Sequence, residues 1–417
     1  MLNNSLMGLG VRARKSATEL AIALSGVKND ALEAIASAVA FHMEQILAAN
    51  AKDMAAAKES GMSDAMQDRL LLTEDRLRDI AEAVRYVKGL EEPVGRVVGG
   101  DIRPNGLQIV KRTVPLGVVG MIYESRPNVT VDCAALCLKS GNACILRGGK
   151  EAIHSNMALV SVMREAVESV GLSADCIQLV EDTSRETATE LMRLNGYVDV
   201  LIPRGGAGLI ASVVKNATVP VIETGAGNCH IFVDATADLE MAARVLNNAK
   251  TSRPSVCNAV ETLLVHRDCG AKFLPMAADA LAHAGVELRG CEQTVAILGE
   301  RAKPATEEDW ATEYDDYILA IRVVEDMEEA IAHIEAYSTR HSETIMTQSH
   351  DNARLFCDRV DSAAVYVNAS TRFTDGGEFG LGAEIGISTQ KLHARGPMGL
   401  AHLTSYKYII NGSGQIR

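Results

Sequence analysis

The feature that most constrains the fold is an alternation of short apolar runs with helix-length stretches between residues 118 and 222. Strands are predicted at 118–122, 143–146, 177–180, 198–202 and 219–222, and helices near 129–139, 151–169, 184–194 and 207–215. Because these runs lack polar alternation, they indicate a parallel sheet covered by helices on both faces. Sheets of this kind commonly hold a nucleotide at the carboxyl ends of their strands.

A second alternating stretch follows Gly225. Its predicted strands are 231–233, 262–265, 294–298, 318–324, 344–346 and 364–367, with helix starts at Asp238, Asp268 and Asp326. The sequence therefore predicts two α/β domains. We expect residues 1–99 and 116–225 to form the nucleotide-binding domain and residues 226–398 to form the second domain.

The first hundred residues carry helical periodicity, with predicted N-caps at Asn29-Asp30 and at Thr73. The segment 101–111 contains Asn105-Gly106 between β-formers and predicts a hairpin. Residues 403–410 alternate like a strand. Open strand edges favour pairing with another subunit, so we expect 100–115 and 399–417 to serve oligomerisation. The alternative is a solvent-exposed β-tongue.

Composition excludes several classes of protein. The formal charge of −13 argues against a nucleic-acid scaffold, and no apolar run reaches the length of a membrane span. Nine cysteines without a CxxC pair or Cys/His ligand spacing indicate reduced thiols and no metal site. The stretch 1–15 lacks the long apolar region of a secretory signal, so we expect a cytoplasmic protein.

Cys257 and Glu223 form the candidate chemical pair. Cys257 lies between a helix-like run and a strand-like run, and Glu223 lies 34 positions earlier, at the end of an apolar strand. Thiolates attack acyl carbons, and a nearby carboxylate can handle a proton or a water. A cysteine followed by a strand is more often a small core residue, so the neighbouring motifs decide between the two interpretations.

Four segments in order give the chain a resemblance to the aldehyde dehydrogenase superfamily. They are Pro115-Leu116-Gly117 with Gly141-Asn142, then Glu223-Thr224-Gly225-Ala226-Gly227-Asn228, then Ser252-Arg253-Pro254-Ser255-Val256-Cys257-Asn258, and finally Glu378-Phe379-Gly380-Leu381-Gly382. The resemblance covers nearly the whole chain. It implies an aldehyde dehydrogenase-like α/β fold, with two doubly wound domains and an oligomerisation element built from the hairpin and the C-terminal strand. It also implies that Cys257 is the nucleophile and Glu223 its partner.

The segment Tyr123-Glu124-Ser125-Arg126-Pro127-Asn128 makes the resemblance closest to the members that reduce L-glutamyl 5-phosphate with NADPH. Those enzymes produce glutamate 5-semialdehyde and phosphate in proline biosynthesis, through a cysteine thioester. In hydrolytic relatives the glutamate activates water, which would destroy such a thioester. We therefore expect Glu223 to handle a proton or contact the cofactor, with a structural carboxylate as the alternative.

The resemblance also assigns the cofactor residues. Arg147-Gly148-Gly149-Lys150 replaces a segment that usually ends in an acid, and Lys150 places a cation where a 2′-phosphate would lie. This favours NADPH over NADH. Gly205 and Gly206 match the pyrophosphate turn, where backbone amides can face the anion. Glu313 falls where the family has its nicotinamide-ribose glutamate, although an exposed loop charge is the alternative.

Three further residues are assigned to the substrate. Asn128 is the candidate side chain of the oxyanion site, together with the backbone N–H of Cys257. Arg126 and Arg253 stand beside prolines in the two segments closest to the chemistry. A guanidinium suits phosphate or carboxylate, so both are candidate anion contacts, with surface arginine as the alternative.

Competing functions remain open at this point. A hydrolytic NAD(P)-dependent aldehyde dehydrogenase is favoured by Glu223 and disfavoured by the segment Ser125-Arg126-Pro127. A cofactor-free cysteine hydrolase or a non-enzymatic binding protein is disfavoured by the nucleotide-type sheet and the Cys257/Glu223 pair. A labile acyl phosphate also makes association with a glutamate 5-kinase an attractive hypothesis.

Overall fold

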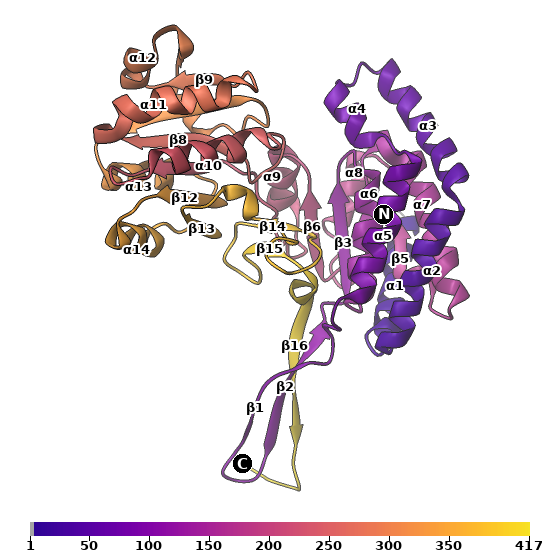
Figure 1. The fold of residues 1–417 in the computed structure, drawn as a ribbon. Helices are drawn as coiled ribbons and strands as arrows, with labels where there is room; N and C mark the ends of the chain where they lie inside the picture. The colour runs from indigo at the N-terminus through magenta and orange to yellow at the C-terminus, as the bar shows by residue number, and fades with distance from the viewer. Residues whose placement is uncertain (1–3) are drawn as a thin grey trace. The chain divides into compact units, whose positions relative to one another are not determined.

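The computed structural model describes residues 4–417, and the chain divides into two compact units (Figure 1). Unit 1 comprises Met1–Glu223, Leu381–Gly386 and Met398–Arg417. Unit 2 comprises Thr224–Gly380 and Ile387–Pro397. Each unit has a parallel sheet of its own, and the two are described separately.

The sheet of unit 1 has the strand order β5-β4-β3-β6. Its parallel strands are β3 (Val118–Tyr123), β4 (Ala143–Arg147), β5 (Ile177–Leu179) and β6 (Val200–Arg204). All six residues of β3 are buried, as expected for a strand covered on both faces. These four strands confirm the predictions. The predicted strand 219–222 is wrong as a regular strand, since only Val221 forms an isolated bridge, to Leu201.

Helices occupy most of the remainder of unit 1. They are α1 (Asn4–Leu20), α2 (Ser25–Phe41), α3 (Met43–Glu59), α4 (Asp64–Leu70), α5 (Glu74–Gly89), α6 (Pro127–Lys139), α7 (Ile153–Ser169), α8 (Arg185–Leu191) and α9 (Ala207–Asn216), with 3-10 turns η1 (Lys150–Ala152), η2 (Ala174–Cys176) and η6 (Leu400–Leu403). The segment 1–15 was expected not to be a secretory signal. Its residues 4–15 lie in α1, and residues 1–3 lie outside the described residues.

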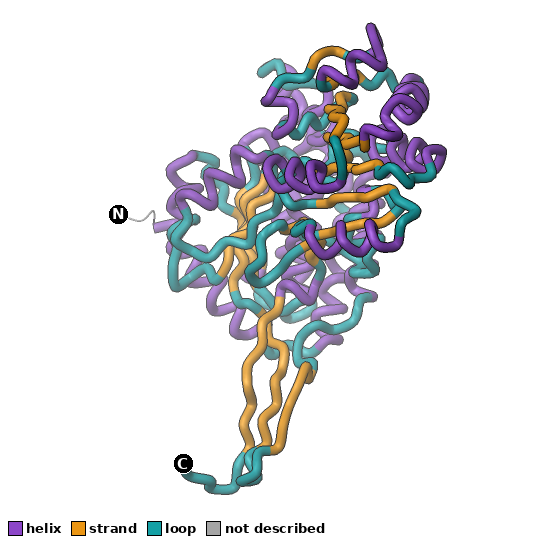
Figure 2. Tube along the Cα trace, turned by 90° about the vertical axis from the view of Figure 1, so that its left-hand side faces the viewer, coloured by secondary structure: helices purple, strands orange, loops and turns teal. Residues whose placement is uncertain are grey.

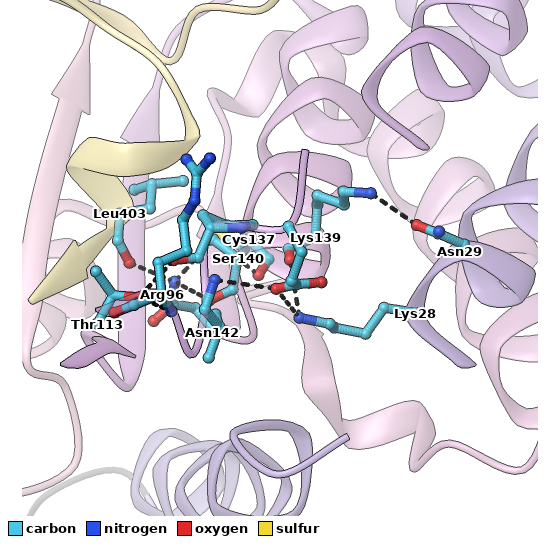
Figure 3. A network of polar contacts seen from close by, with 12 residues as sticks. Lys28, Asn29, Arg96, Thr113, Cys137, Lys139, Ser140, Asn142 and Leu403 are labelled. Carbon is cyan, nitrogen blue, oxygen red and sulfur yellow. Dashed lines mark hydrogen bonds and ion pairs between the residues drawn. The ribbon is translucent and has the colours of Figure 1, made fainter. Parts of the chain in front are cut away.

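Of the two predicted helix caps in unit 1, one is confirmed and one is wrong. Thr73 caps α5, because its hydroxyl accepts a hydrogen bond from the N–H of Arg76 at 3.2 Å. Asn29 does not cap a helix, since α2 begins at Ser25. The Asn29 amide oxygen instead accepts a hydrogen bond from the ammonium of the buried Lys139 at 2.7 Å (Figure 3). Asn29 is thus a packing partner between helices rather than a helix start.

A three-stranded antiparallel sheet, here called the tongue, projects from unit 1 (Figure 1). It consists of β1 (Val97–Ile102), β2 (Gln108–Pro115) and β16 (Thr404–Asn411), in the order β1-β2-β16. The three strands run side by side in Figure 2, and the predicted turn at Asn105-Gly106 joins β1 to β2, with Gly106 at φ +86°. The predicted hairpin and C-terminal strand are therefore confirmed.

The base of the tongue is tied to the body of unit 1 by Asn142, which is 1% exposed. Its amide nitrogen donates to the carbonyl of Leu403 at 2.8 Å, and its amide oxygen accepts from the N–H of Gly117 at 2.8 Å (Figure 3). One buried side chain, just before β4, therefore joins the residue that precedes β16 to the connection between β2 and β3.

The sheet of unit 2 has seven parallel strands in the order β10-β9-β11-β8-β7-β12-β13. The strands are β7 (Cys229–Val233), β8 (Val260–His266), β9 (Glu287–Gly290), β10 (Lys303–Pro304), β11 (Ile318–Val324), β12 (Ser342–Met346) and β13 (Ala364–Val367). Strands β14 (Gly386–Ser388) and β15 (Gly396–Met398) form a two-stranded sheet of their own.

Two apolar clusters cover the two faces of this sheet. Leu263 and Val265 of β8 pack with residues of α10 and α11, whereas Leu264 packs with residues of α13 and α14. The alternation follows from the period of two residues along a strand. The helices of unit 2 are α10 (Leu239–Thr251), α11 (Arg267–Ala282), α12 (Glu292–Leu298), α13 (Met327–Tyr337) and α14 (His350–Arg359), with η3 (Gly299–Arg301), η4 (Glu307–Ala311) and η5 (Thr371–Phe373).

Sequence patterns in unit 2 were mostly accurate. Asp238 and Asp326 cap α10 and α13, as predicted, while α11 is capped by His266 and has Asp268 in its first turn. The predicted strand 294–298 is wrong, because these residues form most of α12. A run of five apolar or β-branched residues fits either element, and Gly299 at φ +59° ends the helix directly afterwards.

No single helix among residues 4–417 is long and apolar enough to cross a bilayer, although α2 and α3 together, bent by 68°, meet the criteria of length and composition. All nine cysteines are free. Within the described part of the chain, no group of His, Cys, Asp and Glu side chains is arranged to hold a metal ion.

Candidate active site

Cys257 lies in the loop between α10 and β8 and is half-buried. Of the other eight cysteines, six are buried, and burial raises the pKa of thiols such as Cys133, Cys229 and Cys269. Cys357 is exposed on α14, and Cys291 is half-buried with its sulfur accepting from the N–H of Val323. Cys257 is therefore a half-buried thiol in an irregular loop, where a nucleophile can be reached, whereas the half-buried Cys291 sulfur is bound to the backbone beside α12.

The backbone of Cys257 is held by the turn that precedes β7. A Cβ atom placed on Gly227 would lie only 1.5 Å from the carbonyl oxygen of Cys257, so the two backbones are in direct contact. The thiol of Cys229, fully buried beside Gly227, donates to the same carbonyl at 3.2 Å. The backbone position of Cys257 is thus set by a glycine that has no room for a side chain.

Glu313 supports this turn from the other side. Its Oε1 accepts a hydrogen bond from the N–H of Gly227 at 2.7 Å. Burial raises the pKa of Glu313, the bond from Gly227 acts against that rise, and the charge of Asp315 adds to it. The residue predicted to contact the nicotinamide ribose therefore also contacts the turn that packs on Cys257.

A cluster that the sequence did not reveal surrounds Asn258, the residue after Cys257. Thr371 donates its hydroxyl to the carbonyl of Asn258 at 2.6 Å, and the Asn258 amide donates to the carbonyl of Thr374 at 2.9 Å. The Arg372 guanidinium donates through Nη1 to Oδ1 of Asn258 and through Nε to the hydroxyl of Ser252 at 3.0 Å. Because Arg372 is 114 positions from Asn258, no local pattern could have predicted the contact.

The predicted anion contacts lie in different units. Arg253 is exposed in the loop of Cys257, in unit 2. Arg126 is half-buried at the N-cap of α6, in unit 1. The structure therefore brings Arg253, Cys257 and Arg372 into one loop cluster, in which Arg372 was not predicted.

Asn128, the predicted oxyanion residue, is exposed in the first turn of α6 in unit 1. Its amide nitrogen donates to Oδ2 of Asp132 at 3.1 Å. Burial raises the pKa of Asp132 to about 6, while the bond from Asn128 and the charge of Arg204 work in the opposite direction. The Asn128 side chain is thus oriented by a carboxyl group one helical turn away.

The predicted pyrophosphate turn, Gly205-Gly206, lies between the end of β6 and the start of α9. The N–H of Gly206 donates to Oε2 of Glu124 at 2.9 Å. A carboxylate therefore stands at the amide of this turn, which demonstrates that the turn accepts an anionic oxygen. The N–H of Gly206 is thus the donor of this turn that the structure shows bound to an oxygen anion.

The segment at the end of β4 supplies two cations. Arg147 donates through Nη2 to the carbonyls of Thr183 and Ser184 at 2.6 and 3.1 Å, and its pKa is lowered, first of all by burial. Lys150 is exposed at the start of η1 and forms no ion pair with the residues described here. Arg147 thus orders a loop, whereas Lys150 offers an exposed ammonium.

Glu223, the predicted partner of Cys257, is half-buried and is the last residue of the first segment of unit 1. It lies outside regular structure, two residues after the bridge between Val221 and Leu201. This places the carboxylate on an irregular segment that follows the sheet, where functional side chains are common.

The comparison with protein families matches residues 12–295 to the aldehyde dehydrogenase family. The two parallel sheets with their covering helices, together with this match, define an oxidoreductase of the aldehyde dehydrogenase class. Membership in this class implies a nicotinamide cofactor.

Relatives with curated names refine the assignment. A gamma-glutamyl phosphate reductase from Moorella thermoacetica is 62% identical over 98% of this chain and 97% of its own length. One from Clostridium perfringens is 58% identical over the full length of both. The crystal structure of gamma-glutamyl phosphate reductase from Thermotoga maritima matches 99% of this chain and all of its own, with a TM-score of 0.97 and 49% identity. The chain therefore belongs to the aldehyde dehydrogenase family and, within it, to the gamma-glutamyl phosphate reductases. Both the resemblance and the expected fold class are confirmed.

Proposed function

We propose that this protein reduces L-glutamyl 5-phosphate to L-glutamate 5-semialdehyde and phosphate with NADPH, through a thioester on Cys257, in proline biosynthesis in the cytoplasm. The observation that carries the proposal is the built environment of Cys257, a half-buried thiol whose backbone is in contact with Gly227. The curated relatives that align over nearly the whole chain, and that carry the name of this reductase, support the choice of substrate.

In the proposed reaction, the Cys257 thiolate forms a bond to the acyl carbon, and the bond from that carbon to the phosphate oxygen breaks. Phosphate leaves with the electron pair and takes up one proton. The bound nicotinamide supplies the hydride that reduces the thioester carbonyl. The resulting alkoxide on Cys257 collapses to the aldehyde and releases the thiolate, so the chain returns to its starting state.

Three groups are assigned to the charge and protons of this reaction: the side chains of Asn128 and Glu223 and the backbone N–H of Cys257. Asn128 and the backbone N–H of Cys257 are proposed donors to the developing oxyanion. Glu223 is proposed to handle a proton or to contact the cofactor rather than to activate water, because hydrolysis would consume the thioester before its reduction.

The cofactor is proposed to be NADPH, held by the residues that the sequence assigned to cofactor binding. The amides of Gly205 and Gly206 would face the pyrophosphate, and the exposed ammonium of Lys150 would pair with the 2′-phosphate. Glu313 would accept a hydrogen bond from the nicotinamide ribose. Arg147 would act indirectly, since its guanidinium binds the carbonyls of Thr183 and Ser184.

The tongue is proposed to pair with a second copy of the chain. All six residues of β1 are exposed, and Ile102, Tyr408 and Ile410 each expose more than half of their surface. Exposed apolar strands at an open sheet edge favour association. Association with a glutamate 5-kinase is a further proposal, because hand-over would protect the labile acyl phosphate.

The reverse reaction tests the proposal. Glutamate 5-semialdehyde and NADP are incubated with the protein, with and without inorganic phosphate, and NADPH formation is followed by absorbance. The proposal predicts sustained turnover only when phosphate is present. Equal turnover without phosphate would instead identify a hydrolytic aldehyde dehydrogenase, and a strong preference for NAD would overturn the assignment of Lys150.

A further inference from the structure

Arg372 occupies an unusual position, because its own segment is fastened to the residue next to the nucleophile. Thr371 binds the carbonyl of Asn258, the Asn258 amide binds the carbonyls of Thr374 and Arg372, and the Arg372 guanidinium binds the Asn258 side chain. Asn258 is buried, so these bonds fix the distance between the guanidinium and the loop of Cys257.

The guanidinium of Arg372 retains donor capacity. An arginine carries five N–H groups, of which Nε uses one for Ser252 and Nη1 uses one for Asn258. Three N–H groups, including both on Nη2, have no protein acceptor among the described residues. The side chain is half-buried, so part of the group remains accessible to a ligand.

The charge of Arg372 also lacks a direct counter-ion. No Asp or Glu of the described residues lies within ion-pair distance of Arg372 or of Arg253. The pKa of Arg372 is lowered by burial and then by the charge of Arg253, while Asp375, Cys257 and Cys229 act to raise it. Arg372 binds Ser252, the residue before Arg253, so both arginines belong to the loop cluster of Cys257. An anionic ligand there would relieve the repulsion between their charges.

We propose that Arg372, together with Arg253, forms the subsite for the phosphoryl group of the acyl phosphate. This inference rests on the proposed function and adds the leaving-group site to it. The phosphoryl group is joined to the attacked carbon through a single oxygen, whereas the α-carboxylate lies at the other end of the substrate chain. A guanidinium anchored to the residue after Cys257 is therefore placed for the phosphoryl group, and two forked cations suit its two negative charges.

The subsite acts in both directions of the reaction. In the forward direction the guanidinium groups stabilise the charge that gathers on the phosphate as its bond to the acyl carbon breaks. In the reverse direction they hold inorganic phosphate while its oxygen attacks the thioester carbon, the carbon–sulfur bond breaks and the Cys257 thiolate is released.

Steady-state kinetics of the reverse reaction test the assignment. For Arg372→Gln we expect the KM for phosphate to rise by about tenfold to a hundredfold, with the KM for glutamate 5-semialdehyde within about twofold of the wild type. Arg372→Lys should recover part of the loss, because it keeps the charge without the fork. Arg253→Gln, at an exposed residue without a hydrogen bond in the described structure, should raise the phosphate KM by a smaller factor. A rise confined to the semialdehyde KM would overturn the proposal in favour of an α-carboxylate site.

Alkylation of Cys257 provides a readout that does not depend on turnover. Anionic iodoacetate and neutral iodoacetamide need the same thiolate, so a purely structural role of Arg372 changes both rates equally. We expect Arg372→Gln to lower the ratio of the iodoacetate rate to the iodoacetamide rate by about tenfold, measured by mass spectrometry of the Cys257 peptide. Inorganic phosphate should slow iodoacetate in the wild type and not in Arg372→Gln.

Arg359→Gln serves as the matched control, because Arg359 pairs with Glu328 on the surface of the same unit. It should leave the KM for phosphate and the alkylation ratio unchanged. If the wild type needs no phosphate for turnover, the proposed function fails, and the alkylation experiment still reports whether Arg372 binds inorganic phosphate. An unchanged ratio and equal phosphate protection in Arg372→Gln would overturn the subsite itself.

Discussion

Two glycine turns of this protein look alike in sequence and serve opposite purposes. At Gly206, in unit 1, an added Cβ would have Glu124 Oε2 at 3.9 Å as its nearest neighbour, so there is open space beside the turn. At Gly227, in unit 2, an added Cβ would collide with the Cys257 carbonyl oxygen at 1.5 Å. The first glycine leaves open space beside it, whereas the second leaves room only for the backbone of Cys257.

The two turns also differ in what their amides bind. The N–H of Gly206 donates to a carboxylate on an exposed side chain, which can move when a phosphate arrives. The N–H of Gly227 donates to Glu313, and the neighbouring Asn228 is fully buried and bound to the carbonyls of Trp310 and Tyr337. The difference teaches that a glycine pattern alone does not distinguish an exchangeable anion site from a fixed scaffold.

The largest effect is expected from Gly227→Ala. Because the new methyl group must displace the Cys257 carbonyl, we expect kcat to fall by at least about a hundredfold, while NADPH still binds. Stopped-time assays give kcat, and fluorescence titration gives the cofactor affinity. Gly270→Ala is the control, since a Cβ on this helical glycine meets only ordinary contacts at 3.9 Å. Near-normal kcat in Gly227→Ala would contradict the account of this turn.

Asp309 can be used to test how much its segment stabilises the turn at Gly227. It precedes Trp310, whose carbonyl accepts a hydrogen bond from the side chain of Asn228, the residue after Gly227. Burial disfavours the Asp309 carboxylate, but hydrogen bonds from the Thr306 N–H, Arg289 and Tyr314 outweigh it and lower the pKa of Asp309 to about 2. A lowered pKa stabilises the fold above the ordinary value near 3.8, and that stability is lost as the pH falls from there toward 2.

For Asp309→Asn we therefore expect a loss of about 2 kcal/mol in the free energy of unfolding at pH 7. The difference from the wild type should shrink between about pH 4 and pH 2, where the wild-type carboxylate becomes protonated. Urea unfolding followed by circular dichroism at several pH values measures both quantities. A pH-independent difference would show that the ionised carboxylate is not the stabilising form.

Glu124→Gln in unit 1 is expected to have a smaller effect, and it should strengthen a function, the binding of NADPH, rather than weaken one. The Glu124 carboxylate occupies the amide of Gly206 and would have to leave before a pyrophosphate binds there. Removing its charge should lower the Kd for NADPH by about two- to fivefold, measured by isothermal titration calorimetry. Weaker NADPH binding in the variant would mean that Glu124 assists the cofactor rather than competes with it.

The smallest effect is expected from Gly206→Ala. Its backbone, at φ −68° and ψ 165°, suits any residue, and the added methyl group meets no atom closer than 3.9 Å. We expect the free energy of unfolding to change by less than about 0.5 kcal/mol and the KM for NADPH to rise only a few-fold. A loss as severe as that of Gly227→Ala would erase the distinction between the two turns.

Most of the strands and helix starts of the fold could be predicted from the sequence, because local residue patterns determine them. Apolar runs located the central strands of both sheets, and Thr73, Asp238 and Asp326 marked helix starts through their own side-chain bonds. The strand predicted at residues 294–298 was wrong because a short apolar run does not distinguish a strand from a helix. Asn29 misled because its side chain binds Lys139, a partner 110 positions away.

The site was predictable only where it follows a motif. The predictions of Cys257 and Glu313 as site residues rest on the order of the segments that resemble the aldehyde dehydrogenase family. The contacts of Arg372 with Asn258 and of Cys229 with Cys257 join residues far apart in the chain, and only packing brings them together. Tertiary contacts of this kind leave no spacing in the sequence from which they could be read.

The central claim, that Cys257 carries the acyl group, can be tested by mass spectrometry of the trapped enzyme. The protein is incubated with glutamate 5-semialdehyde and NADP without phosphate, quenched in acid and digested. We expect a glutamyl group on the peptide that contains Cys257. It should disappear when phosphate is added before the quench and be absent from Cys257→Ala. An unmodified Cys257 peptide, or an adduct on another cysteine, would contradict it.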